Sequence, residues 1–330
     1  MRALMLGRSG TLTLVQTPVP ENPGECLIRI RLAGICGTDL ELRRGYADFA
    51  GIPGHEFVGI VERAPARAAS WIGRRVVGEI NIGCGTCRFC RDGVREHCEQ
   101  RTVLGIRGRS GAFADYLTLP PENLHSVPDA MTDEQAVFVE PVAAACRILE
   151  QVPIGESTRT AIVGDGRMAL LTAQVLRTAG ARPTVVGKHE EKLAVARALG
   201  FETLGGDETP RPPRAFDLVV DLSGRPDGFA RALALVRPRG TVVLKSTFHG
   251  EIPWTPWPAI VDEITLVGSR CGPFVPALAL LAAGRINVGP IVSGVFGLED
   301  YRAAFDAARH RLKVLLRLAE APNPHVARTR

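Results

Sequence analysis

Strand and helix patterns alternate along the chain from about Ser157 onward. Short apolar runs typical of buried strands are each separated from the next by a stretch with helical character. Strands are expected at residues 161–163, 184–186, 217–221, 241–244 and 264–267, and helices at 168–178, 190–199 and 227–235. Such alternation is the signature of a parallel sheet covered by helices on both faces. We therefore predict a doubly wound Rossmann domain over residues 154–284.

The first 150 residues follow a different pattern, in which β-rich runs are broken by Gly and Pro. These runs lie at residues 26–32, 57–61, 75–77 and 116–119, and they indicate a compact β-barrel-like domain. The segment 291–318 has mixed strand and helix character, and we expect it to return to the first domain. That domain is then predicted to comprise residues 1–153 and 285–330.

Composition excludes several classes of protein. The chain has 330 residues, 45% of them hydrophobic and 23% charged, which argues for an ordinary globular protein of about two domains. The net charge of +5 is spread along the chain, so nothing requires nucleic acid as a partner. The apolar run from Cys271 to Gly284 is interrupted by Gly and Pro and is expected to form a core helix rather than a membrane span. The N-terminus lacks a signal-peptide pattern, so a cytoplasmic location is expected.

Four of the eight cysteines form a C-x2-C-x2-C-x7-C cluster: Cys84, Cys87, Cys90 and Cys98. Gly83, Gly85 and Gly93 would let the backbone bend so that the four sulfur atoms converge. Four thiolates suit tetrahedral zinc and leave no open position for a substrate, so the expected role is structural. An iron-sulfur cluster is the alternative, but its usual spacing ends in C-x3-C-P.

A second ligand set involves Cys36, which lacks a cysteine partner at ligand spacing, as do Cys26, Cys146 and Cys271. The sequence Cys36-Gly37-Thr38-Asp39 is followed, nineteen residues after the cysteine, by His55-Glu56. A thiolate, an imidazole and a carboxylate together make a three-ligand metal site with one position left open.

With these motifs, the four-cysteine cluster, Glu140-Pro141 and the glycine turn described below, the sequence resembles the zinc-dependent medium-chain dehydrogenase/reductase family over nearly its whole length. The resemblance implies a GroES-like β-barrel catalytic domain beside the Rossmann domain. It also implies a catalytic zinc bound by Cys36 and His55, with Glu56 or Glu140 as third ligand and water or substrate as fourth. Homodimers or homotetramers are implied as well.

The resemblance assigns roles to three residues near Cys36. Asp39 matches a carboxylate that accepts the remaining N–H of the histidine ligand, and Thr38 matches a hydroxyl that hydrogen-bonds the substrate oxygen and passes its proton onward. Relatives commonly carry a histidine as the next residue of this proton relay, and at that position this chain has Glu41. A carboxyl group with a pKa of about 4.3 is a poor match for a relay that operates near pH 7.

A nucleotide-binding turn is predicted between the first strand and helix of the second domain. Gly164-Asp165-Gly166-Arg167-Met168-Ala169 fits the G-x-G-x-x-A pattern, which lets a pyrophosphate approach the helix N-terminus. The residues expected to bind cofactor here are Gly164, Gly166, Arg167 and Met168.

The end of the second strand bears on the choice of nucleotide. An NAD-specific site would place Asp or Glu there, but the chain has Gly187-Lys188-His189. Lys188, helped by His189, offers positive charge to a 2′-phosphate, so we predict a preference for NADP(H), with NAD possible. Ser223 is expected to line the adenosine pocket, and Ser246 and Ser269 follow later strands in a similar way.

These features predict a zinc-dependent oxidoreductase that transfers hydride between NAD(P) and an alcohol/carbonyl pair of the polyol, sugar or amino-alcohol type. Candidate substrate-pocket residues are Tyr46, Phe49, Phe113 and Arg270. Two alternatives remain open: a zinc-free quinone or enone reductase of the same fold, and a non-catalytic nucleotide-sensing protein.

Overall fold

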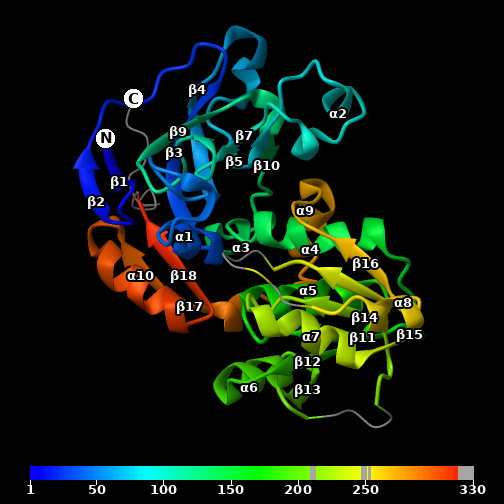
Figure 1. Ribbon diagram of the computed structural model, residues 1–330. Helices are drawn as coiled ribbons and strands as arrows, with labels where there is room; N and C mark the ends of the chain where they lie inside the picture. The colour runs from blue at the N-terminus through cyan, green and yellow to red at the C-terminus, as the bar shows by residue number, and fades with distance from the viewer. Residues whose placement is uncertain (209–212, 247–250, 252–253, 319–330) are drawn as a thin grey trace. The chain divides into compact units, whose positions relative to one another are not determined.

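The computed structural model describes residues 1–208, 213–246, 251 and 254–318 (Figure 1). The chain divides into two compact units, Met1–Phe138 with Gly294–Arg330, and Val139–Ser293. The N-terminal part of the first unit thus ends before the helix that starts at Val139, whereas the sequence interpretation assigned all residues of this helix to the first domain. None of the helices within the described residues is long and apolar enough to cross a membrane.

The first unit is built mainly from antiparallel strands, and all four strands expected from the sequence are present. Its largest sheet has seven strands in the order β10-β5-β4-β3-β18-β17, with β9 also paired to β3. The bounds are β3 Cys26–Gly34, β4 Glu56–Arg63, β5 Arg75–Gly78, β9 Tyr116–Leu119, β10 Leu124–Ser126, β17 Val292–Gly297 and β18 Lys313–Arg317. Strand β3 pairs with β4, β9 and β18, and its Leu and Ile side chains are buried.

Smaller elements complete this unit. A β-hairpin and a three-stranded sheet are formed by β1 Arg2–Leu6, β2 Leu12–Gln16, β6 Asn81–Ile82, β7 Thr102–Leu104 and β8 Gly108–Arg109. The helices are α1 Gly37–Leu42, α2 Arg88–Arg91, α3 Asp133–Ala136 and α10 Tyr301–His310. Strand β18 pairs antiparallel with β3, Leu315 opposite Gly34, so this late strand is part of the main sheet of the first unit.

The second unit contains a six-stranded parallel sheet in the order β13-β12-β11-β14-β15-β16. Its strands are β11 Arg159–Val163, β12 Arg182–Gly187, β13 Glu202–Gly205, β14 Phe216–Asp221, β15 Val236–Leu244 and β16 Thr265–Gly268. The order reverses beside β11, which makes the carboxyl end of β11 a topological switch point. Apolar side chains of β11, β14 and α7 form a buried core that includes Ala161, Val219 and Phe229.

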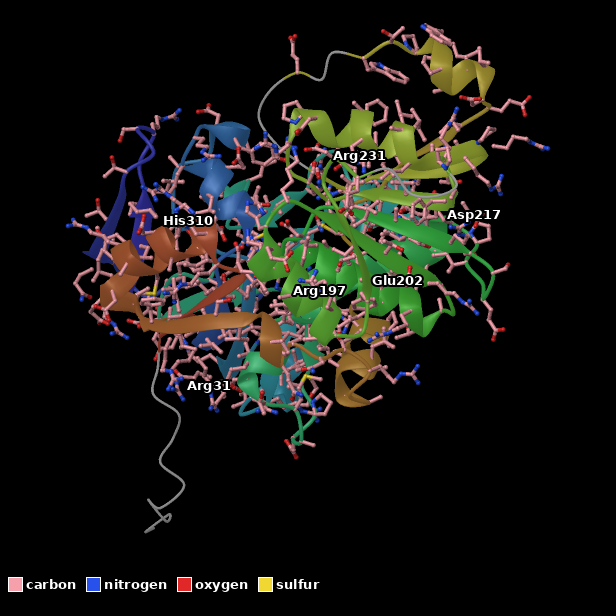
Figure 2. All side chains as sticks on the ribbon, turned by 90° about the horizontal axis from the view of Figure 1, so that it is seen from below. Arg31, Arg197, Glu202, Asp217, Arg231 and His310 are labelled. Atoms are coloured by element: carbon pink, nitrogen blue, oxygen red, sulfur yellow. The ribbon has the colours of Figure 1, made fainter. Side chains whose placement is uncertain are left out.

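The helices of this unit are α4 Val139–Gln151, α5 Arg167–Thr178, α6 Glu190–Ala198, α7 Pro226–Leu235, α8 Trp257–Val261 and α9 Phe274–Ala282. The expected doubly wound arrangement is confirmed, with one strand added: β13, whose first residue Glu202 is labelled in Figure 2. Helix α9 packs against α4 through one face only. Its Val275 is 67% exposed, so α9 is a surface helix rather than the core helix expected from its composition.

Apolar side chains are exposed beside strand β16, the last strand of the parallel sheet. We call Trp257, Ile260, Val261 and Leu266 the β16 edge patch; they are 62%, 71%, 70% and 38% exposed. Three of them belong to α8, which is tied to the start of β16 by a hydrogen bond of 2.9 Å from the Ile264 N–H to the Ala259 carbonyl. The described part of the second unit therefore carries an apolar surface next to an unpaired strand edge.

Candidate metal centres and dinucleotide loop

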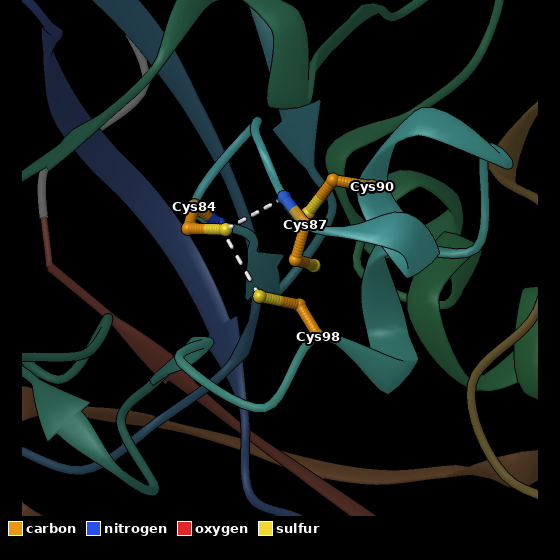
Figure 3. Close-up of side chains that lie close together, drawn as sticks. All are labelled: Cys84, Cys87, Cys90 and Cys98. Atoms are coloured by element: carbon orange, nitrogen blue, oxygen red, sulfur yellow. Dashed lines mark hydrogen bonds between the residues drawn. The ribbon is translucent and has the colours of Figure 1, made fainter.

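The four clustered cysteines converge in a lobe of the first unit, as Figure 3 shows. Their sulfur atoms all lie within 4.8 Å of one another. Cys87 caps α2 and Cys90 lies within that helix, while Cys84 follows β6 and Cys98 follows a turn of 3₁₀-helix. A side chain at Gly83 would come within 2.7 Å of the Cys90 sulfur, so the close approach of this backbone requires glycine.

Backbone N–H groups already support negative charge on these sulfurs. The Cys87 N–H donates to the Cys84 sulfur at 3.4 Å, and the Cys84 N–H donates to the Cys98 sulfur at 3.4 Å. Hydrogen bonds from the backbone and side chain of Thr86 and from the Cys87 N–H lower the pKa of Cys84 to about 6. A thiolate formed this readily among three further thiols fits the tetrahedral zinc site that the spacing predicts.

The second group of ligand atoms consists of the Cys36 sulfur, a His55 ring nitrogen and a Glu56 carboxylate oxygen, again all within 4.8 Å of one another. Strand pairing explains why they meet. Gly34 at the end of β3 lies opposite Glu56 at the start of β4, so the residues just after β3 and just before β4 emerge side by side.

Asp39 joins the two segments that carry these ligands. Its side chain is fully buried and accepts hydrogen bonds from the Cys36 N–H at 2.8 Å and from the Gly54 N–H at 3.2 Å. The His55 Nδ1 atom lies 3.5 Å from an Asp39 oxygen. This arrangement leaves Nε2 of His55 to serve as the ligand atom, as the sequence interpretation of Asp39 requires.

The surroundings of this group favour a positive charge. Burial disfavours a charged His55, but the nearby Asp39 and Cys36 outweigh it and raise the pKa of His55 well above its usual value. The Glu56 Oε1 atom is buried and has no hydrogen-bond partner. Buried polar atoms are normally satisfied, so an unsatisfied carboxylate oxygen beside a thiol and an imidazole fits a divalent metal ion.

A buried lysine that the sequence did not single out contacts Glu56. Lys313, the first residue of β18, is fully buried, and its Nζ forms an ion pair with Glu56 Oε2. Nζ also donates to the Ile35 carbonyl at 3.4 Å. Burial lowers the pKa of Lys313 to about 8. In the sequence, Lys313 is visible only as a single lysine at the start of an apolar strand. Its contact with Glu56 depends on the pairing of strands and could not be predicted from that pattern.

The other residues assigned to this centre are placed as follows. The Thr38 hydroxyl oxygen lies 3.8 Å from the Cys36 sulfur. Glu41 lies on α1 and pairs with Arg44 at 2.7 Å. Glu140 belongs to the second unit, in the first turn of α4. There its charge acts on Lys245, whose pKa burial lowers to about 8.

The glycine turn of the second unit has the predicted form. It joins β11 to α5, with Gly166 capping the helix and Arg167 and Met168 in its first turn. Gly164 has φ 127°, and a side chain there would come within 2.6 Å of the Leu222 carbonyl oxygen. Ala169 is fully buried, in agreement with the need for a small residue at that position.

Asp165, the residue between the two glycines, reaches the end of β12. One of its oxygens accepts hydrogen bonds from the N–H groups of Lys188 at 2.7 Å and His189 at 2.9 Å. The His189 Nδ1 atom lies 3.0 Å from both carboxylate oxygens. Burial raises the pKa of Asp165, but these donors more than offset it, so the pKa is lowered overall. The sequence interpretation quoted Asp165 within the glycine turn but gave it no role.

The two cations expected to receive a 2′-phosphate therefore have partners of their own. The Lys188 Nζ atom lies 3.3 Å from Asp227, which also pairs with Arg225, and His189 faces Asp165. The predicted preference for NADP(H) stays a prediction.

The serines lie at the carboxyl ends of strands, as expected. The Ser223 N–H donates to the buried Asp221 carboxylate at 3.0 Å, and the Ser246 hydroxyl accepts from the Gly224 N–H at 2.9 Å. The Ser269 hydroxyl accepts from Lys245 at 3.1 Å.

The four candidate pocket residues divide into two kinds. Tyr46 and Arg270 are half-buried, whereas Phe49 is buried. Phe113 is fully buried and packs edge-on against Phe305, with 5.8 Å between ring centroids. Phe113 is therefore a core residue, and the expectation that it lines a pocket is corrected.

Comparison with known proteins agrees with this geometry. Residues 22–129 match the alcohol dehydrogenase GroES-like domain, and residues 168–283 match the zinc-binding dehydrogenase domain. The chain is 34% identical to an L-threonine 3-dehydrogenase of Streptomyces avermitilis, over 91% of this chain and 94% of that protein. It is 28% identical to D-arabinitol dehydrogenase 1 of Uromyces fabae, over 96% and 97% of the two chains. A zinc-binding dehydrogenase of Sinorhizobium meliloti 1021 bound to NADP has a similar structure, with a TM-score of 0.86, 27% identity and coverage of 96% and 99%.

Proposed function

Because the chain belongs to the zinc-dependent medium-chain dehydrogenase family, we propose that the Cys36, His55 and Glu56 group is the centre at which it interconverts an alcohol and its carbonyl compound. The chain is a zinc-type alcohol dehydrogenase that uses a nicotinamide dinucleotide. The observation that supports this assignment of residues is the convergence of three buried or half-buried ligand groups around one point.

Each residue has a distinct part in this proposal. Cys36, His55 and Glu56 would hold a zinc ion, and a zinc ion bound there would supply the Lewis acid that polarises an alcohol oxygen and lowers its pKa. Asp39 fixes the ring orientation of His55 through Nδ1, and Lys313 holds the Glu56 carboxylate. The Thr38 hydroxyl would hydrogen-bond the substrate oxygen and relay its proton, accepting that proton while its own proton passes onward toward solvent.

Two features of the proposal concern the proton path and the third ligand. Glu41 pairs with exposed Arg44, so we expect Glu41→Gln to slow turnover only modestly.

Glu56 is the third ligand in this proposal because it belongs to the same group of ligand atoms as Cys36 and His55, whereas Glu140 acts on Lys245 within the second unit.

The substrate class that we propose is a polyol, a sugar or an amino alcohol. Support comes from the names of the relatives, which act on threonine and arabinitol. No observation favours the zinc-free reductase or the nucleotide sensor, and neither would need three convergent ligand groups.

A substrate panel tests the proposed function. The purified chain is incubated with polyols, sugars and amino alcohols and either NAD⁺ or NADP⁺, reduced nucleotide is followed by absorbance, and zinc is measured. We expect turnover with at least one alcohol, and its loss in Cys36→Ser and His55→Ala. The matched control is Cys26→Ser, since Cys26 is a buried cysteine of the same unit outside both ligand groups. Full activity of Cys36→Ser would contradict the assignment.

We also propose that the chain forms a homodimer or homotetramer, supported by the β16 edge patch and the exposed strand edge beside it. A cytoplasmic location is proposed as well, because none of the eight cysteines is in a disulfide bond and a four-thiol zinc site requires a reducing compartment. Cell fractionation of the expressed protein tests the location.

A further inference from the structure

The space beside Gly187 is filled by a carboxylate from another segment of the chain. A side chain built on Gly187 would come within 2.5 Å of the Asp165 Cβ and 2.6 Å of one of its carboxylate oxygens. In Rossmann domains an acidic residue at the end of the second strand binds the 2′-hydroxyl of the adenosine ribose. Asp165 thus brings a carboxylate to the place of the missing acid, but from the glycine turn.

The hydrogen-bond donors at the end of β12 contact the Asp165 carboxylate. The N–H groups of Lys188 and His189, at the start of α6, converge on a single Asp165 oxygen, and the ring of His189 closes the set. Convergent N–H groups at a helix start are the donors that a phosphate group uses. Asp165, whose side chain is 9% exposed, therefore takes up the hydrogen bonds that a 2′-phosphate would need.

The remaining charges at this edge of the sheet include two cations that share one carboxylate. The Lys188 ammonium pairs with Asp227, and Asp227 pairs with Arg225. A 2′-phosphate arriving at the end of β12 would meet the Asp165 carboxylate and a lysine that already has a counter-charge. Like charges at such short range repel, and more strongly where the site is partly buried.

We propose that Asp165 determines nucleotide choice by occupying the donors of the Lys188–His189 loop and by repelling a 2′-phosphate. The inference rests on the proposed function, in that the glycine turn must bind a dinucleotide. It opposes the preference for NADP(H) predicted from Lys188, because that prediction counted the cations of the loop without the carboxylate that engages them.

The structure also shows which substitution tests this idea cleanly. Gly187→Asp would force a new side chain into the Asp165 carboxylate and change two features at once. Asp165→Ser removes both the charge and the reach of the side chain, whereas Asp165→Asn removes the charge and keeps the size. The matched control is Asp217→Asn (Figure 2), because Asp217 also accepts a backbone N–H, from Arg159 at 2.8 Å, but lies at the amino end of the strands.

The experiment measures binding rather than turnover. Isothermal titration of the full zinc-loaded chain with 2′,5′-ADP and with 5′-AMP reports the effect of the 2′-phosphate alone, and thermal unfolding checks that each variant folds. In both Asp165 variants we expect the affinity for 2′,5′-ADP to rise about tenfold relative to that for 5′-AMP, with no change of this ratio in Asp217→Asn.

An unchanged ratio would overturn the inference, and a fall in the ratio would show instead that Asp165 positions the loop for a 2′-phosphate. If the parent chain bound 5′-AMP but the Asp165 substitutions left the ratio of the two affinities unchanged, only the inference about Asp165 would fail. If neither fragment bound, the proposed dinucleotide site would fail with it.

Discussion

Two buried side chains of opposite charge support the ligand group of the first unit. Asp39 links the backbone of Cys36 and Gly54, and Lys313 neutralises Glu56. Removing one member of a buried ion pair leaves the other charge without compensation and costs about 3–5 kcal/mol. The consequences of losing Lys313 should therefore depend on whether a metal ion supplies the missing positive charge.

Lys313→Met tests this dependence. We expect the metal-free protein to lose about 3 kcal/mol of unfolding free energy and the zinc-loaded protein to lose clearly less, because the metal ion then compensates Glu56. Thermal unfolding with and without zinc measures both values. Equal losses in the two states would contradict Glu56 as a ligand of the metal ion, and Lys192→Met, a change on α6 of the other unit, serves as control.

Asp165 makes a pH-dependent contribution to stability. Its folded-state pKa is lowered, so its hydrogen bonds stabilise the fold above the unfolded-state pKa of about 3.9 and are lost as the pH falls below it. Asp165→Asn should therefore be less stable than the parent chain at pH 7, and the difference should shrink as the pH falls below about 4. Urea unfolding at several pH values measures it, and a difference that is constant with pH would contradict an ionised Asp165.

Sequence reasoning found the ligand residues but not the side chains that hold them. Cys36, His55 and the four clustered cysteines have metal-ligand chemistry and telling spacings, which are local properties of the sequence. Lys313 and Asp165 act over contacts that only strand pairing and the turn geometry create. No spacing rule connects Lys313 to Glu56, which lies 257 positions earlier in the chain.

At the scale of elements, the zinc lobe formed by residues 83–98 has little apolar packing of its own. Within it Cys98 is the one buried residue, so its order should depend on the metal. Cys90→Ser is expected to lower the zinc content from about two to about one per chain and to expose the lobe to trypsin at Arg88 and Arg91.

Atomic absorption and limited proteolysis check this prediction, with Cys26→Ser as the control that keeps both zinc ions. A Cys90→Ser protein that retained its full zinc content and its resistance to trypsin would contradict a structural metal in this lobe.

Four of the strands predicted in the second unit are buried in the sheet, whereas β16 was also predicted although its residues are largely exposed. Strands β11, β12, β14 and β15 contain runs of Val, Ile or Leu that are buried in the sheet. Strand β13 has none of its residues fully buried, because it lies at the sheet edge, and its sequence Glu-Thr-Leu-Gly carries no hydrophobic periodicity. The short strands β6, β7 and β8 contain only two or three residues each, too few for any period to show.

At the scale of the whole molecule, the β16 edge patch bears on assembly. A charge placed at Leu266 or Ile260 should prevent a second copy from covering this surface. We expect Ile260→Glu with Leu266→Glu to shift the protein to monomers in light scattering coupled to gel filtration. Val295→Glu is the matched control, since Val295 is an exposed apolar residue of β17 in the other unit. An unchanged molar mass in the double variant would place the interface elsewhere.

The pairing of β18 with β3 has a consequence for the order in which a growing polypeptide acquires its metal. All ligands of the proposed catalytic zinc leave the ribosome within the first 60 residues, but the strand that completes their sheet and carries Lys313 emerges about 250 residues later. Until then Glu56 has no lysine to neutralise it, so a nascent chain that has already captured zinc would hold the metal in an unfinished sheet. The entire dinucleotide-binding unit must therefore be synthesised before β18 can complete the main sheet of the first unit.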